Sequence, residues 1–398
     1  MTSTSDLGGS GPLEIGVYGA RAIPSTYSGF ETFLTTLLPE LAAKGHRVTM
    51  YCRRGEDGSE ASSYAGVGRV VLPAVPGKRF STLSHGALAS LVSRWSRHDV
   101  VLVVNPANSL FCWFNRLTGQ PVVLNVDGQE WLRGKWGRVA RRLFHFASRI
   151  SGRSANALVA DCRGMAEVFR DEFGAVSTVI PYCSPSFAWA PDPAVLVAQG
   201  VSPRAYLVTG GRLNPENNID GIARAFSETD LPIPLLVLGA ANYDSPVKRE
   251  LERLAARDPR VRLLGHVGDR AAFLSMLNGA TAYIHGHSVG GMNPSLVEAM
   301  RAGTLVVALD TVFNREVLDD AGLFFPGGIG WVGELAPILE HVTHLADEES
   351  DAYRAKAVVR AEVEFALVDV VEAYDDLLRE TAGSLRRTSV RIPTRWAP

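Results

Sequence analysis

The sequence is poor in cysteine, and its few thiols stand far apart. The four cysteines have no paired spacing; they are Cys52, Cys112, Cys162 and Cys183. Zinc sites and redox dithiols need cysteines a few residues from each other, so neither is expected. The sequence predicts four small buried hydrophobic side chains in a reducing compartment.

Long apolar runs and metal-binding clusters are also missing. No stretch is long enough to cross a bilayer, and the N-terminus lacks the apolar core of a signal peptide. Without an Asp-x-Asp motif or clustered His and Cys, we expect no bound divalent metal and no other cofactor. A net charge of -2 gives no general attraction to nucleic acid. A cytoplasmic protein without a nucleic-acid partner is predicted.

Short apolar runs alternate with helical patterns along the chain. Strands are predicted at residues 14–19, 47–51, 70–72, 99–104, 121–125, 157–160, 178–180, 206–211, 235–239, 261–265, 282–284, 305–308 and 323–325. Helical periodicity lies between them, for instance at residues 30–44, 247–256 and 269–277. This alternation predicts an α/β fold with parallel sheets. Two such units of similar size predict two Rossmann-like domains that face each other across a cleft, with ligands at the carboxyl ends of the strands.

Composition places the domain boundaries. A segment rich in Pro, Ser and Ala separates the two alternating units, and both ends of the chain are rich in small, polar or arginine residues. The predicted segments are a disordered N-terminus at 1–12, a Rossmann-like domain at 13–183, a linker at 184–203, a second Rossmann-like domain at 204–360, a helix at 361–381 that packs back on the first domain, and a tail at 382–398.

Residues 286–300 combine a glycine pair with the start of a helix. Gly290 and Gly291 follow a predicted strand, and Asn293 precedes an apolar-periodic run that contains Glu298. Backbone N–H groups and the helix dipole favour an anion at such a helix start. Glu298, about one turn inside the helix, is placed to accept hydrogen bonds from hydroxyls of the same ligand. A phosphate beside a hydroxyl indicates a sugar nucleotide.

Two polar loops follow strands of the first half. Residues 19–32 form a long loop without the glycine spacing of a dinucleotide fingerprint, which favours substrate contact over an ordinary connection. Asp127 and Glu130 follow the strand at 121–125 and are expected at the mouth of the same cleft. The alternative for Asp127 is a helix cap.

The second half offers an arginine and a histidine at strand ends. Gly211 and Arg212 follow the strand at 206–211, where glycine lets a ligand approach and arginine grips a diphosphate bidentately. His266 follows the strand at 261–265. It is a candidate for lining a base pocket, although a core or surface role is the commoner one for a single histidine.

Residues 131–160 contain no acidic residue but many arginines, among them Arg133, Arg138, Arg141, Arg142, Arg149 and Arg153. Aromatic and aliphatic side chains lie between them. The pattern fits either a peripheral contact with anionic lipid at the inner face of the membrane or a solvated helix face.

The motifs at 27–32, 45–48, 127–136, 211–218, 290–300 and 313–316 occur in an informative order. This order resembles that of the family-4 retaining glycosyltransferases of GT-B fold, over residues 15–378. The combination looks like the rhamnosyltransferase-like branch of bacterial surface-polysaccharide synthesis. The resemblance implies a nucleotide-diphosphate sugar on the C-terminal domain and a glycan or lipid-linked acceptor on the N-terminal domain.

The motifs and the resemblance together give a candidate site. The candidate catalytic residues are Asp127 and Arg212. Donor contacts are expected from Gly211, Arg212, Asn217, His266, Gly290, Gly291, Met292, Asn293 and Glu298. Acceptor contacts are expected from Tyr27, Gly29, Glu31 and Glu130.

Three positions depart from the family pattern. Many relatives have a lysine where this chain has Asn217, an acid where it has Gly290, and a histidine where it has Asp127. The departures fit a transferase for a different donor, such as a deoxysugar. Two alternatives remain open, which are a non-catalytic protein that binds nucleotide sugars and an epimerase of sugar nucleotides.

Overall fold

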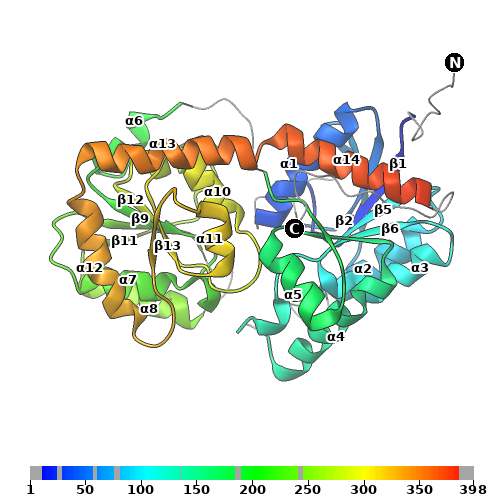
Figure 1. Ribbon diagram of the computed structural model, residues 1–398, viewed down its shortest axis with the longest axis horizontal. Coiled ribbons are helices and arrows are strands. Elements are labelled where there is room, and N and C mark those ends of the chain that lie inside the picture. The colour runs from blue at the N-terminus through cyan, green and yellow to red at the C-terminus, as the bar shows by residue number, and fades with distance from the viewer. Residues whose placement is uncertain are drawn as a thin grey trace, which may run out of the picture.

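Two sheets, one in each half of the chain, organise the protein (Figure 1). The structure is a computed structural model and describes residues 11–24, 29–56, 61–75, 81–134, 136–183, 190–240 and 245–384. The predicted disordered N-terminus and tail lie mostly outside these ranges, and Tyr27 lies outside them as well. The predicted α/β architecture of two domains is confirmed.

The N-terminal sheet, within the described residues, has eight strands in the order β3-β4-β2-β1-β5-β6-β7-β8. Only the short β3, which the sequence did not predict, runs antiparallel to its neighbour. The strands are β1 Glu14–Tyr18, β2 Arg47–Arg53, β3 Ser63–Tyr64, β4 Val67–Leu72, β5 Val100–Val104, β6 Val122–Asn125, β7 Ala157–Ala160 and β8 Thr178–Val179. The central β5 is buried along its whole length, as its unbroken apolar sequence favours.

Helices connect these strands. They are α1 Gly29–Ala43, α2 Ser81–Ser93, α3 Cys112–Arg116, α4 Arg138–Ser154 and α5 Arg163–Phe173, with 3-10 turns η1 Pro106–Leu110 and η2 Glu130–Leu132. In α1, Phe33, Leu34, Leu37, Leu38 and Leu41 are buried at helical spacing. The helix therefore presents one apolar stripe to the core, and its first residue points toward the other domain.

The C-terminal sheet, in the part of the chain that is described, has six parallel strands in the order β11-β10-β9-β12-β13-β14. The strands are β9 Leu207–Gly210, β10 Leu235–Leu238, β11 Val261–Gly265, β12 Ala282–His285, β13 Val306–Leu309 and β14 Leu323–Phe325. The connecting elements are η3 Pro215–Asn217, α7 Ile219–Ser227, α8 Pro246–Arg257, α9 Arg270–Gly279, α10 Pro294–Arg301, α11 Val312–Leu318 and α12 Trp331–Thr343. The order places β9 and β12 side by side, so the loops that follow them lie next to each other.

The chain returns to the N-terminal domain at its end. The helical run expected at 361–381 is instead the last part of two helices, α13 Asp347–Glu364 and α14 Leu367–Ser384. Helix α13 lies along the C-terminal domain and α14 along the N-terminal one (Figure 1). Tyr374 of α14 accepts a hydrogen bond of 3.0 Å from Asn125 at the end of β6. The segment predicted as a linker contains a short helix, α6 Pro193–Ala198.

Two expectations from composition can be compared with the structure. The four cysteines, all of them within the described residues, are buried and form no disulfide. No helix in the described ranges combines the length and the apolar composition that crossing a membrane requires.

Candidate active site

The loops after β6, β7 and β12 meet between the two domains. A Cβ atom on Gly290 would lie 2.5 Å from the backbone nitrogen of Gln129, and one on Gly291 would lie 2.2 Å from Oδ2 of Asp161. The backbone N–H of Met292 donates a hydrogen bond of 2.6 Å to the same Asp161 oxygen. Residues 290–292, which we call the glycine loop, therefore touch the N-terminal domain through backbone.

Asp127 and Asp161 form a pair of carboxyl groups under the glycine loop. Asp161 is fully buried, whereas Asp127 keeps part of its surface exposed. Burial raises the pKa of Asp161 well above its usual range, and the neighbouring Asp127 carboxyl raises it further. Burial likewise raises the pKa of Asp127, while the neighbouring Asp161 and Tyr182 side chains lower it. Sequence reasoning found Asp127 but missed Asp161, which follows its strand in the same way.

Arg133 occupies the centre of the contact and holds acids from both domains. Its guanidinium lies 2.9 Å from Glu130 and 3.7 Å from Glu216 of η3. Glu130 also accepts a hydrogen bond of 2.6 Å from the indole of Trp136. Glu130, predicted to contact the acceptor, is thus engaged inside the N-terminal domain and orients Arg133.

Arg212 and Glu31 are brought together from opposite domains. Glu31 is buried on α1, and burial raises its pKa, while the positive charges of Arg212, Arg21 and Arg53 oppose the rise. Arg212 is half-buried after β9. The predicted diphosphate-binding arginine therefore faces the predicted acceptor carboxylate.

Asn217 joins two loops of the C-terminal domain. Its amide nitrogen donates to the Arg212 carbonyl at 2.7 Å, and its amide oxygen lies 2.8 Å from Nδ1 of His287. Burial lowers the pKa of His287 well below its usual range, and the positive charge of Arg133 adds to this. A neutral His287 donates from one ring nitrogen only, and its two nitrogens face the Asn217 amide oxygen and, at 3.3 Å, the Gly290 carbonyl. Sequence reasoning gave His287 no role, although its place within the glycine-rich motif was a usable signal.

Helix α10 begins at the same place. Asn293 caps it by accepting a hydrogen bond of 3.1 Å from the backbone N–H of Ser295. A Cβ atom on Gly29, the first residue of α1, would lie 2.8 Å from the ring of Pro294. The starts of α1 and α10 thus pack against each other, and bulk at Gly29 would separate them.

Glu298 is buried on α10 and forms an ion pair with Arg270, the first residue of α9. Burial lowers the pKa of Arg270 to about 10. Sequence reasoning missed this arginine, because nothing in its local pattern shows its partner. His266 is exposed just after β11, the edge strand of the sheet, in the loop that leads to Arg270.

A second polar contact joins the domains. Glu316 of α11 accepts hydrogen bonds of 2.6 and 2.9 Å from the backbone N–H groups of Arg163 and Gly164. These groups form the start of α5, where the helix dipole favours a carboxylate. The side chain of Phe313 packs on Gly164 beside it. The 313–316 motif therefore contributes to domain docking.

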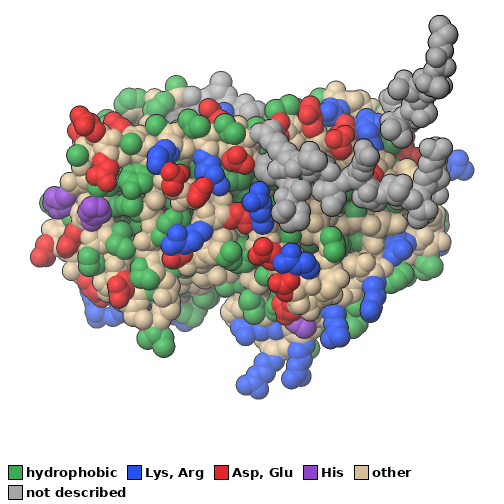
Figure 2. Space-filling view, in the orientation of Figure 1, with side chains coloured by type: hydrophobic (Ala, Val, Ile, Leu, Met, Phe, Trp, Pro, Cys, Tyr) green, Lys and Arg blue, Asp and Glu red, His purple; other side chains and the backbone are tan. Residues whose placement is uncertain are grey.

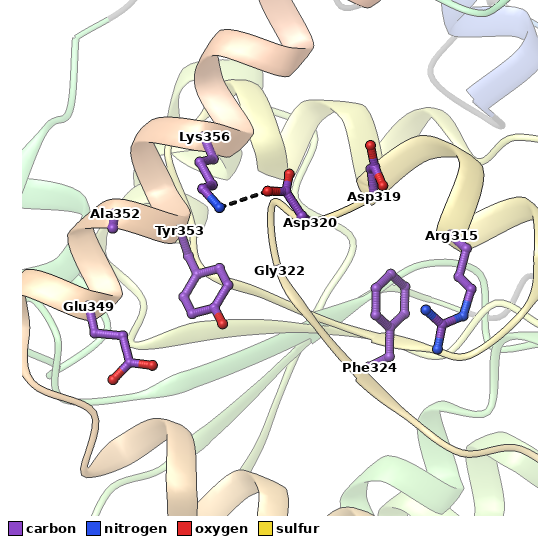
Figure 3. Close-up of a pocket in the computed structure, with 9 residues that line it drawn as sticks. All are labelled: Arg315, Asp319, Asp320, Gly322, Phe324, Glu349, Ala352, Tyr353 and Lys356. Carbon is purple, nitrogen blue, oxygen red and sulfur yellow. Dashed lines mark hydrogen bonds and ion pairs between the residues drawn. The ribbon is translucent and has the colours of Figure 1, made fainter.

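Metal-binding clusters and a surface hollow are the two remaining features that bear on the site. Among the residues that the structure describes, no group of His, Cys, Asp and Glu is arranged to hold a metal ion. An open hollow of about 450 Å³ lies between α11, β14 and α13 (Figure 3). Lys356 lies 2.7 Å from Asp320 within the hollow, whereas Arg315 and Asp319 pair with Asp310 and Arg360 outside its lining. This hollow shares none of the loops described above.

Two family profiles match successive parts of the chain. The profile of glycosyl transferase 4-like domains matches residues 28–183, and that of glycosyl transferases group 1 matches residues 199–335. The curated O-antigen chain mannosyltransferase B of Escherichia coli is 26% identical over 161 residues. That match spans 39% of this chain and only 40% of the relative.

Solved structures show the same fold over nearly the whole chain. HepE of Anabaena, in complex with UDP, has a TM-score of 0.72 at 16% identity and covers 92% of this chain and 99% of its own. Sucrose-phosphate synthase of Thermosynechococcus elongatus has a TM-score of 0.78 at 16% identity, with 94% and 100% covered. The fold is therefore GT-B.

Proposed function

We propose, from the premise that this chain belongs to the glycosyltransferases of GT-B fold, that it is a retaining, metal-independent transferase. It moves a sugar from a nucleotide-diphosphate donor to a glycan or lipid-linked acceptor. The observation that carries the proposal is the meeting of the glycine loop with Asp127 and Asp161 of the other domain, beside the contact between the starts of α10 and α1.

The donor diphosphate would lie at the glycine loop, with Arg212 beside it. Backbone N–H groups at a helix start bind phosphate well, and arginine adds a bidentate grip. The same groups would stabilise the negative charge that grows on the leaving diphosphate. Glu298 would accept hydrogen bonds from the ribose hydroxyls and share its charge with Arg270. Closure of the domains would exclude water and limit hydrolysis.

For the sugar, we propose a neutral hexose or deoxyhexose, with rhamnose as the first candidate. Asp127 stands where many relatives have a histidine, and a partly exposed carboxylate accepts hydrogen bonds from sugar hydroxyls. The similarity to a mannosyltransferase makes mannose the second candidate.

A donor screen tests the proposal. The purified chain is heated with a set of UDP-, GDP- and dTDP-sugars, and a donor that binds raises its melting temperature. At a concentration a hundredfold above Kd, binding adds about 2.7 kcal/mol to the free energy of unfolding. Mass spectrometry then follows nucleotide release, with and without EDTA. Binding with no release, whatever acceptor is supplied, would contradict the transferase.

Helix α4 supports an acceptor at a membrane surface. Its arginines gather over the lower edge of the molecule in Figure 2, and the helix has no acidic residue. Val139 and Phe146 are 81% and 53% exposed on its outward face, with Leu143 between them. A solvated helix carries polar residues on this face, so outward apolar residues flanked by arginine favour a lipid interface.

Vesicle flotation tests this contact. We expect the chain to float with phosphatidylcholine vesicles that contain phosphatidylglycerol. With vesicles of phosphatidylcholine alone, it should remain unbound at the bottom of the gradient. Val139→Ser with Phe146→Ser should abolish flotation. The control is Val359→Ser, which removes an equally exposed valine from α13 of the other domain. No dependence on anionic lipid would show a solvated face.

One observation favours a second candidate, a non-catalytic protein that binds nucleotide sugars. Asn217 replaces a phosphate-binding lysine of many relatives, and both polar atoms of its amide are used inside the domain. The diphosphate would thus have one cation fewer. The nucleotide-release assay separates the candidates, because this protein would bind donors and release nothing.

A further inference from the structure

Asp161 stands out among the buried acids because it contacts both Asp127 of its own domain and the glycine loop of the other domain. It follows β7 of the N-terminal domain and is fully buried. Its Oδ2 accepts the hydrogen bond of 2.6 Å from Met292 in the glycine loop. Gly291 packs so closely on it that any Cβ would overlap this oxygen.

The other oxygen of Asp161 needs a proton. Oδ1 is buried and receives no hydrogen bond from an N–H or O–H donor of the described residues. It lies beside Asp127, whose Oδ1 would be 2.6 Å from the same Cβ on Gly291. Two ionised carboxylates in a buried contact repel each other, whereas one proton shared between them makes a strong hydrogen bond.

We propose that Asp161, as a neutral carboxylic acid, is a positioning residue that ties the glycine loop of one domain to Asp127 of the other. Its O–H donates to Asp127 and keeps that carboxylate aimed at the ligand space. Its carbonyl oxygen accepts the Met292 N–H and fixes the loop. It touches no substrate, and its role in catalysis rests on the function proposed above.

The groups around Asp127 and Asp161 favour the state in which the two carboxyl groups hold one proton between them, rather than none or two. Tyr182 from the segment after β8 and Tyr374 from α14 both face the carboxyl pair and stay protonated, because burial raises the pKa of each. Arg133 lies near Asp127 and favours its ionised form, which Glu130 opposes. Cys162, next in the chain, stays a thiol because burial raises its pKa. The acid that keeps the proton is therefore Asp161.

The sign of the pH dependence follows. The contact between the domains requires protonated Asp161, whose pKa is raised in the docked state. Docking is therefore complete at low pH and weakens as the pH rises through that raised pKa. Above it, two negative charges face each other, and their repulsion opposes the docked position even though the Met292 hydrogen bond by itself favours ionised Asp161.

The test compares Asp161→Asn with Asp161→Ala in the full chain. The asparagine amide nitrogen donates to Asp127 at every pH, and the amide oxygen accepts the hydrogen bond from the Met292 N–H. This variant should therefore keep the contact between the domains, and the contact should no longer depend on pH. Alanine should lose the contact at every pH. Asp171→Asn on the exposed surface of α5 is the matched control and should behave like the wild type. A thermal unfolding curve establishes that each variant is folded.

The first readout is hydrogen exchange of the peptide that contains the Met292 amide, without ligand. We expect exchange about tenfold faster in Asp161→Ala than in Asp161→Asn at one pH. The wild type should match the Asn variant at low pH and approach the Ala variant as the pH rises through the raised pKa of Asp161. This readout does not depend on turnover, so it holds whether or not the proposed function does.

The second readout is the affinity for UDP, GDP and dTDP over the same pH range. Loss of binding of the preferred nucleotide with pH in the wild type but not in Asp161→Asn would link the contact to the donor site. If none of the three nucleotides binds the wild type while exchange follows the expected pattern, the proposed function fails and the role of Asp161 stands. If Asp161→Asn exchanges as fast as Asp161→Ala, or keeps the pH dependence of the wild type, the proposal for Asp161 is overturned.

Discussion

Gly290 and Gly291 let two domains approach to backbone contact. Their missing side chains leave room for Gln129 on one side and for the Asp127–Asp161 pair on the other. Gly291 also has a φ of 38°, in the left-handed region that favours glycine. The acid that many relatives have at position 290 would not fit this contact, so a departure from the family pattern has a steric reason here.

The first prediction concerns Gly291. Gly291→Ala places a methyl group against two carboxyl groups and should weaken donor binding by at least about tenfold, because the loop must move from its position. Binding of the donor found in the screen measures this by calorimetry. Gly333→Ala on helix α12, where a Cβ meets open space, is the control and should bind normally. Normal binding by Gly291→Ala would refute the loop assignment.

The second prediction concerns Glu298. Glu298→Ala should weaken donor binding by about 10- to 100-fold, because hydrogen bonds to a charged group contribute about 1.5–3 kcal/mol. Glu298→Gln keeps the shape of the side chain and should lose less donor affinity than Glu298→Ala. Glu334→Ala, an exposed acid on α12, is the control. Wild-type donor affinity in Glu298→Ala would contradict the assignment of the ribose contact to Glu298. A thermal unfolding curve shows whether Arg270, left without its ion-pair partner, destabilises the fold.

At the scale of elements, helix ends and strand ends place the chemistry. The start of α10 meets the start of α1, and the start of α5 receives Glu316. Helix α14 contributes differently, since it crosses to the N-terminal domain and binds it through a buried polar contact. There Asp375 lies 2.9 Å from Nε2 of His46 and 2.7 Å from Nε of Arg379.

The third prediction follows from that contact. Asp375→Ala leaves the buried His46 without its carboxylate partner and should lower the free energy of unfolding by about 1–3 kcal/mol. Thermal or urea unfolding measures the loss. Asp376→Ala changes the next residue, which is exposed, and should have almost no effect. Equal stability of the two variants would mean that the Asp375 contact does not help to hold α14 on the N-terminal domain.

At the scale of the whole molecule, two sheets face each other through few polar links. Among the described residues, Asp161 with Met292 and Glu316 with α5 are hydrogen-bonded links, and Arg133 with Glu216 is an ion pair. Gly29 with Pro294 and Phe313 with Gly164 are apolar contacts. Few links suit a transferase, because the domains must separate to exchange substrate and close to exclude water.

The fourth prediction concerns this docking. Glu316→Ala removes two hydrogen bonds at a helix start, worth about 1 kcal/mol each, and should shift the molecule toward a more open form. Small-angle scattering should show a larger radius of gyration without ligand. Glu167→Ala on the exposed face of α5 is the control. An unchanged radius would show that docking does not depend on Glu316.

The sequence by itself determined the two-domain α/β fold and nearly every strand, because apolar runs, helical periods and turn residues are local signals. It also marked the loops that carry Asp127, Arg212 and the glycine pair, since ligand sites in parallel sheets follow strand ends. The sequence did not predict the break between α13 and α14, because a continuous helical pattern does not show which domain each part covers.

Only the tertiary structure decided which of these groups meet. It placed Asp161 under the glycine loop, Arg270 beside Glu298, and Arg212 opposite Glu31. It also placed Asn217 and Glu130 in internal contacts and left His266 at a sheet edge. Each partner is distant in sequence, so no local pattern shows the burial and the neighbouring charge that determine what a side chain does.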